Sequence, residues 1–298
     1  MLIRAWLMAM IASLVLVSPL AATPAISAPA TRVLLFTASE SDGVAHSVTD
    51  DAATLIEMTG RRHGLEIDTT DDAAVFSRRS LDTYDVVVWL NNRGHVLTAD
   101  QRTAFADWYR DGGGFIGIHA AAYAEPGWGF FDELVGARPV TGERDKPSRR
   151  TITVSADHPA AAGMPTEWTD QEEQWYRFDR NPEDNAGTTV LATVPSHHGD
   201  GVDPVAWCRN FDGGRTWYLA MGHRVKTYEN GDYTKLLRGG ISWVSGLEKQ
   251  PPVQDRDAAV NWPYPVSFVA WVAAIAVGGS LAVRALNRRD AAGRPDSP

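Results

Sequence analysis

Three histidines lie where apolar stretches of the sequence end, and they are the residues best suited to chemistry. His119 closes the run FIGIH, His223 follows the run TWYLAM, and His46 lies in the loop after the run RVLLFT. Neutral imidazole rings are common ligands for zinc and related metals, and they exchange protons near neutral pH. If the three runs are strands of one sheet, the end of the sheet where ligands bind would bring the three rings together.

The histidines are compatible with three kinds of site. In the first, His46, His119 and His223 bind zinc or another divalent transition metal, and Glu172 or Glu173 completes the site. In the second, His119 or His223 is a general base and Glu173 an acid, acting on a hydroxyl group or on a proton next to a carbonyl. In the third, the histidines only hydrogen-bond the backbone around a binding cleft. The spacing of the three histidines matches no short metal motif, so it does not distinguish among these three kinds of site.

The first half of the sequence predicts strands that alternate with helices. Helical spacing predicts a helix over residues 48–58 and another over 98–109, where Thr98 and Gln101 form a capping box and the glycines at 112–114 end the helix. Apolar runs that fit strands covered on both faces, with a more polar second strand, occur at residues 32–37, 65–69, 85–90 and 115–119.

Beyond His119 the pattern changes to short strands separated by turns. They are predicted at residues 150–154, 175–178, 189–194, 205–209 and 216–221, before a last helix at 233–244. Consecutive strands without helices between them predict an antiparallel extension of the sheet or a hairpin layer beside it. The expected fold class is α/β, with a mostly parallel sheet and this extension.

Four further residues are expected to bind substrate around the histidines. Asn91 follows the third strand, Tyr123 and Trp128 follow the fourth, and Tyr176 lies in the segment predicted as a later strand. Aromatic rings that carry a polar group can stack on ligands that have both apolar and hydroxyl surface.

Both ends of the chain predict export and membrane anchoring. Residues 1–30 combine a positive charge, an apolar run and small residues, as a secretory signal peptide does. Residues 266–284 are predicted to form a transmembrane helix, because their apolar run is just long enough to span a bilayer. Arginines in the tail at 285–298 place that tail in the cytoplasm by the positive-inside rule. The main domain, joined by a linker at 249–265, is therefore expected on the outer face of the cell membrane.

Net charge and cysteine content argue against a nucleic-acid-binding protein and against an internal disulfide. The net charge of -9 argues against a nucleic-acid partner, which would require a basic face. Cys208 is the single cysteine, so the exported domain relies on packing rather than on an internal disulfide.

Three sequence blocks resemble signature blocks of the trehalose-utilisation (ThuA-like) family. They are GGGFIGIHAA at residues 112–121, EQWYRFDRNP at 173–182 and PVAWCRNFDGGRTWYLAMGH at 204–223, and GGISWVSG at 239–246 resembles the family's last helix. The loop with His46 sits where the family has its first histidine. We therefore expect one ThuA-like domain over residues 31–248.

The resemblance implies a fold and a class of ligand. ThuA-like domains share the flavodoxin-like sheet of class I glutamine amidotransferases, in which the fourth strand leads to a nucleophilic cysteine. This chain has His119 at that position, so no thioester can form there and we expect no glutaminase activity. The family's association with trehalose and related sugars implies a carbohydrate or glycoside ligand but no defined reaction. Together with the histidines, it makes metal-dependent hydrolase or lyase chemistry one expectation.

One departure from the family pattern favours a different function. Family members commonly carry an acidic residue directly before the Trp-Tyr pair, and this chain has Gln174 there. A neutral amide is neither a charged ligand nor an acid. Either Glu173 takes over the role, or the domain is a non-catalytic sugar-binding or interaction module on the same fold.

Overall fold

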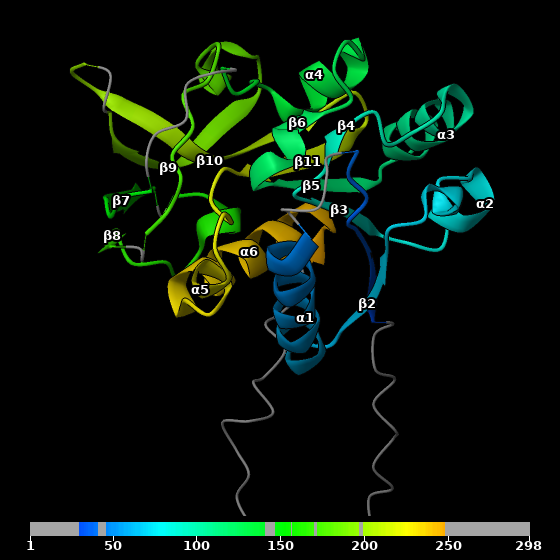
Figure 1. The fold of residues 1–298 in the computed structure, drawn as a ribbon, viewed down its shortest axis with the longest axis horizontal. Coiled ribbons are helices and arrows are strands. Elements are labelled where there is room, and N and C mark those ends of the chain that lie inside the picture. Colours follow the sequence, from blue (N-terminus) through cyan, green and yellow to red (C-terminus); the bar gives the residue numbers. More distant parts are fainter. Residues whose placement is uncertain are drawn as a thin grey trace, which may run out of the picture. The chain divides into compact units, whose positions relative to one another are not determined.

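Strands whose side chains are buried on both faces form the centre of the structure (Figure 1). This computed structural model describes residues 30–40, 46–140, 147–155, 157–169, 172–196 and 199–247. The parallel part of its main sheet consists of β1 (Thr31–Phe36), β2 (Leu65–Thr70), β3 (Val86–Leu90), β5 (Gly114–Ile118) and β11 (Gly214–Leu219). The antiparallel part consists of β7 (Thr151–Val154), β8 (Glu167–Thr169), β9 (Thr188–Pro195) and β10 (Val202–Phe211).

The strand order in the described residues is β2-β1-β3-β5-β11-β10-β9-β7-β8. The pairs from β2 to β11 are parallel, and the pairs from β11 to β8 are antiparallel. The predicted α/β class with a mixed sheet and an antiparallel extension is therefore confirmed. The order of the parallel strands is consistent with a flavodoxin-like sheet.

Helices cover both faces of the parallel strands. Because side chains alternate across a strand, Val88 and Trp89 of β3 belong to opposite faces and to different hydrophobic clusters. The Val88 face packs against α1 (His46–Arg62), α5 (Val225–Tyr228) and α6 (Gly231–Val244). The Trp89 face packs against α2 (Arg78–Leu81), α3 (Ala99–Arg110) and α4 (Gly129–Val135).

Short elements complete the described fold. A two-stranded ribbon joins β4 (Arg93–Gly94) and β6 (Tyr123–Ala124) in parallel. The 3-10 helices are η1 (Ala73–Val75), η2 (His119–Ala122), η3 (Pro159–Ala161) and η4 (Pro182–Asp184).

The predicted strand–helix order of the first half is confirmed to within a few residues. The capping box at the start of α3 is also present: the Thr98 side chain accepts from the Gln101 backbone, and the Gln101 side chain accepts from the Thr98 backbone. The chain leaves α3 through Gly112, whose φ of +105° is a conformation that favours glycine.

The prediction of a strand at residues 175–178 was wrong. Within the segment only Phe178 forms an isolated bridge, with Pro139, and a second bridge just before the segment joins Ser148 and Glu173. Its aromatic side chains are held by tertiary contacts instead, for example by the Trp175 indole, which donates to the Ser148 carbonyl at 2.9 Å. The burial of Trp175 and Tyr176 therefore reflects side-chain packing rather than pairing in a ladder.

The predicted signal peptide (1–30), linker (249–265), transmembrane helix (266–284) and tail (285–298) lie outside the described residues, apart from residue 30. Across the part of the chain that the structure describes, no helix combines the length and the apolar character needed to cross a membrane. Export and anchoring therefore stay predictions.

Candidate functional site

The carboxyl ends of β3, β5 and β11 lie side by side, because β5 pairs in parallel with both other strands. Asn91 follows β3, His119 follows β5, and His223 comes shortly after β11. The ring centroids of His119 and His223 are 5.4 Å apart. The structure thus brings two of the predicted histidines together at the edge where α/β sheets bind their ligands.

His119 begins η2 directly after β5, in a strained backbone conformation. Its φ is +50°, and that of Asn91 on the neighbouring strand is +60°, a region that residues other than glycine adopt infrequently. The main-chain oxygen of His119 accepts a hydrogen bond of 2.6 Å from the buried Tyr218 hydroxyl, which holds this turn. Backbone strain that the surrounding structure maintains clusters at functional sites.

Both ring nitrogens of His119 are hydrogen-bonded. Nδ1 lies 2.7 Å from the Ala220 carbonyl oxygen, and Nε2 lies 2.9 Å from the Tyr176 hydroxyl. Because a carbonyl oxygen only accepts, Nδ1 carries the proton, and Nε2 of the neutral ring accepts from Tyr176. The Tyr176 ring also stacks on the imidazole at a centroid distance of 4.7 Å.

Burial controls the protonation of this pair. Burial lowers the pKa of His119 to about 3. The hydrogen bond to Ala220 opposes this by raising the pKa, and the charges of His223 and Arg93 lower it slightly further. Burial also raises the pKa of Tyr176 well above its ordinary value. At neutral pH the pair is therefore an uncharged imidazole and a protonated phenol.

The stability lost on His119→Asn is expected to shrink as the pH falls. Asparagine tolerates the left-handed backbone but does not titrate. Below pH 6.5 the unfolded wild-type chain binds a proton at His119 that the folded protein does not bind until about pH 3, so the wild type loses stability there. The difference in unfolding free energy between wild type and variant should therefore fall by about 1.4 kcal/mol per pH unit across this window.

Urea denaturation of both full-length proteins at several pH values from about 7 down to 4.5 tests this slope. Glu173 is present in both proteins, so its own titration largely cancels in the difference. A difference that stays constant with pH would show that His119 is not held neutral.

Glu173 is fully buried, and its carboxylate accepts four hydrogen bonds. Oε1 accepts from the backbone N–H groups of Gln174 at 2.8 Å and His223 at 3.0 Å. Oε2 accepts from the backbone N–H of Gly222 at 2.9 Å and from the Thr227 hydroxyl at 2.8 Å. Burial raises the pKa of Glu173 to about 7, while the four hydrogen bonds favour the ionised form. Glu173 therefore fastens the loop after β11 and positions His223.

Three half-buried side chains border the His119–Tyr176 pair. Tyr123 packs edge-on against Tyr176, with ring centroids 5.5 Å apart, and the Arg93 guanidinium lies 4.6 Å from the centre of the Tyr123 ring. His223 contacts the His119 ring and is also half-buried, whereas His119 and Tyr176 are only 3% and 4% exposed. A ligand would therefore meet Tyr123, Arg93 and His223 first.

The four predicted substrate-binding residues are placed in different ways. Tyr123 and Tyr176 lie together beside His119. Asn91 is buried on the neighbouring strand end and donates from Nδ2 to the Thr49 hydroxyl at 3.4 Å. Trp128 packs with the aromatic cluster on the Trp89 face, away from the cluster that contains Tyr176.

The described residues do not fit the predicted metal centre in this arrangement. They contain no group of three or more His, Cys, Asp and Glu side chains that could hold a metal ion. Both ring nitrogens of His119 are hydrogen-bonded, and Glu172 is about half exposed and pairs with Arg224 at 3.2 Å. The backbone of His46 begins α1, but its side chain lies outside the described part of the structure. A metal site that includes His46 stays a prediction.

Sequence reasoning missed several groups that hold the site. The Tyr218 hydroxyl and the Ala220 carbonyl come from the predicted strand at residues 216–221, which reads as ordinary core. The Thr227 hydroxyl comes from α5, a helix that the sequence did not predict. Arg93 lies in the segment after β3 that the strand-end rule selects, so that rule could have identified it.

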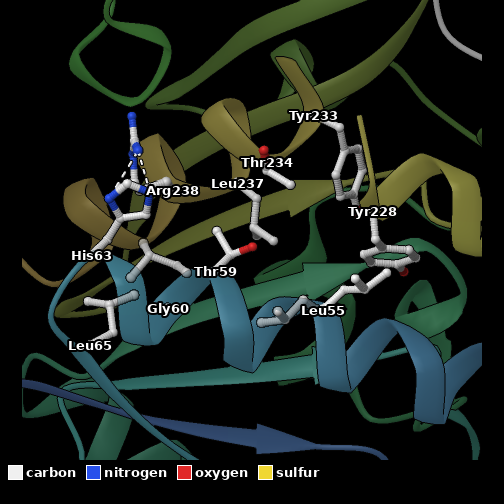
Figure 2. Close-up of a pocket in the computed structure, with 12 residues that line it drawn as sticks. Leu55, Thr59, Gly60, His63, Leu65, Tyr228, Tyr233, Thr234, Leu237 and Arg238 are labelled. Atoms are coloured by element: carbon white, nitrogen blue, oxygen red, sulfur yellow. Dashed lines mark hydrogen bonds between the residues drawn. The ribbon is translucent and has the colours of Figure 1, made fainter. Parts of the chain in front are cut away.

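A separate groove lies between α1 and α6 (Figure 2). Leu55, Leu237 and Tyr228 give it a mainly apolar lining, and at one end Arg238 Nη1 lies 2.7 Å from His63 Nε2. Because the groove offers few polar groups, it is a weaker candidate for chemistry than the carboxyl ends of the strands.

Residues 32–244 match the family model described as ThuA, trehalose utilisation. This match covers most of the chain and includes every described element from β1 to α6 except the first residue of β1. No curated protein matches the sequence.

Solved structures share the fold at low sequence identity. A ThuA-like protein from Bacteroides uniformis has 23% identity and a TM-score of 0.63, over 74% of this chain and 95% of that chain. A ThuA-like protein from Parabacteroides merdae has 18% identity and a TM-score of 0.62, over 75% and 93%. The carbohydrate deacetylase Agd3 has 15% identity and a TM-score of 0.51, over 73% of this chain and 32% of Agd3. These likenesses establish the fold alone.

Proposed function

Because this chain belongs to the ThuA (trehalose utilisation) family, we propose that its carboxyl-edge site binds and processes a carbohydrate or glycoside. The observation that carries this proposal is the row of contacting rings from Tyr123 through Tyr176 and His119 to His223. The row places an amphipathic aromatic surface beside two imidazoles at the ligand-binding edge of the sheet.

The accessible residues divide into a binding part and a proton-transfer part. Tyr123 offers a half-buried ring on which one face of a sugar can stack. His223 is half-buried and is the imidazole that a ligand reaches first, so we assign it the role of general base on a sugar hydroxyl or on a proton next to a carbonyl.

His119 and Tyr176 form the inner part of the site. The Tyr176 hydroxyl donates its proton to His119 Nε2. The lone pairs of the Tyr176 oxygen therefore stay available to accept from a substrate hydroxyl. Glu173 has its acceptor positions used by four protein donors, so we assign it a positioning role in place of the acid role expected from the sequence. No step of this proposal requires a metal ion.

Two further parts of the proposal concern reaction class and location. His119 stands at the turn where the resemblance places the cysteine of glutamine amidotransferases, so the proposed chemistry excludes a glutaminase thioester. The apolar segments at both ends support a domain that is anchored by residues 266–284 and works outside the cell membrane.

Calorimetric titration of the full-length protein, purified in detergent, with trehalose and a panel of glycosides tests the binding part. We expect saturable binding that Tyr123→Ala weakens about tenfold, because the stacking surface is removed. Val202→Ala, at an exposed position on β10, is the matched control and should bind like the wild type.

Mass spectrometry of the same mixtures tests the catalytic part. Wild-type protein should convert one of the bound glycosides, and His223→Ala should bind it but not convert it. Binding without conversion by the wild type would favour the second candidate, a non-catalytic sugar-binding module, which the neutral Gln174 before the Trp-Tyr pair supports. Absence of binding to every sugar would overturn the proposal.

A further inference from the structure

Arg93 is held at the rim of the site by a rigid ribbon rather than by a free loop. It forms β4 with Gly94 and pairs directly with Tyr123 of β6. Its carbonyl oxygen accepts from the Glu40 backbone N–H at 3.0 Å, and the next carbonyl, of Gly94, accepts from the Glu125 backbone N–H at 2.8 Å. The backbone is therefore fixed from both sides of the ribbon.

The side chain of Arg93 lies on the aromatic wall of the site. Its guanidinium carbon is 4.6 Å from the centre of the Tyr123 ring, and Tyr123 contacts Tyr176, which bonds to His119. Burial is the largest influence on the pKa values of His119, Tyr176 and Tyr218, and the positive charge of Arg93 lowers all three. The charge thus acts on the interior of the site.

Arg93 also differs from three other half-buried arginines. Arg102, Arg138 and Arg209 are paired with the carboxylates of Glu125, Asp132 and Glu133, respectively. Among the described residues, no carboxylate forms an ion pair with the Arg93 guanidinium. Glu173, the buried carboxylate of the site, is already satisfied by four protein donors.

We propose that Arg93 binds an anionic group of the substrate, so that the site takes acidic sugars that carry a carboxylate or a phosphate. This inference rests on the proposed function and names the substrate class of the same site. A guanidinium matches the two oxygens of either group with a pair of parallel hydrogen bonds. A sugar ring stacked on Tyr123 would place its acidic substituent beside Arg93 and its hydroxyls toward His119 and His223.

Calorimetric titration of the full-length protein with glucose, glucuronic acid and glucose 6-phosphate tests this inference. We expect at least one acidic sugar to bind about tenfold or more tightly than glucose, with an affinity that decreases as salt is added. The better of the two acidic sugars identifies the anionic group as carboxylate or phosphate.

Three variants separate a charge effect from a structural one. Arg93→Gln should lose the preference for the acidic sugar but retain the affinity for glucose, and Arg93→Lys should keep part of the preference because it keeps the charge. Arg79→Gln removes the same charge from an exposed position on α2 and should behave like the wild type. Even if Arg93→Gln folds poorly, the Arg93→Lys variant and the salt dependence show whether the positive charge at position 93 binds the acidic group.

The outcomes distinguish this inference from the function on which it rests. Equal binding of glucose and both acidic sugars, unchanged in Arg93→Gln, would overturn the role of Arg93 and leave the carbohydrate site in place. No binding of any sugar, neutral or acidic, would overturn both.

Discussion

Replacing Glu173 by glutamine is expected to lower the free energy of unfolding by about 2 to 4 kcal/mol, because a buried acceptor is exchanged for a group that is half donor. The carboxylate faces three backbone N–H groups and one hydroxyl. The Thr227 hydroxyl can rotate to accept from the new amide. The backbone N–H of Gly222 cannot accept a hydrogen bond, so it would face the NH₂ group of the new amide without a bond. In the opposite orientation of the amide, the NH₂ group would face the N–H groups of Gln174 and His223 instead.

The adjacent residue provides a matched control for this variant. Glu172→Gln removes the same charge one position earlier, from a side chain that is about half exposed and forms a surface ion pair with Arg224. Surface ion pairs contribute little, so this change should stay within about 1 kcal/mol of the wild type. Denaturant unfolding of the three full-length proteins at about pH 8, where Glu173 is mostly ionised, measures the difference. Equal losses in the two variants would refute the anchoring role of Glu173.

Gly222→Ala is expected to lower the free energy of unfolding by about 2 to 5 kcal/mol and to abolish ligand binding. The φ of Gly222 is +134°, which side-chain-bearing residues rarely adopt. An added Cβ would lie 2.5 Å from the Tyr228 hydroxyl and 3.2 Å from Cβ of His119. The residue cannot move away easily, because its N–H donates to Glu173 and its carbonyl accepts from Tyr228.

Gly231→Ala is the control for this substitution. Gly231 begins α6, and an added Cβ there would meet no atom within 4 Å. We expect this variant to match the wild type or to be slightly more stable, since alanine restricts the unfolded chain. Thermal unfolding and titration with the bound glycoside should separate the two variants clearly. A Gly222→Ala protein with normal stability and binding would show that the loop after β11 is not tightly fitted around His119.

The sequence by itself determined the fold class and the edge of the sheet at which the candidate residues Asn91 and His119 lie. Apolar runs with helical segments between them are typical of strands covered on both faces, and this pattern correctly predicted β1, β3 and β5. Polar residues directly after these runs identified Asn91 and His119, because strand ends leave the core at positions that the hydrophobic pattern itself defines.

Only the tertiary structure decided what each of these residues does. His119 and Ala220 are 101 positions apart, and Glu173 and Gly222 are 49 apart, so no local pattern could reveal that they are hydrogen-bonded. Glu172 and Glu173 are the same residue type in adjacent positions, yet one is exposed and the other is fully buried. The physical reason is that burial and hydrogen-bond partners, which fix the charge and role of a side chain, are supplied by segments that meet only when the chain folds.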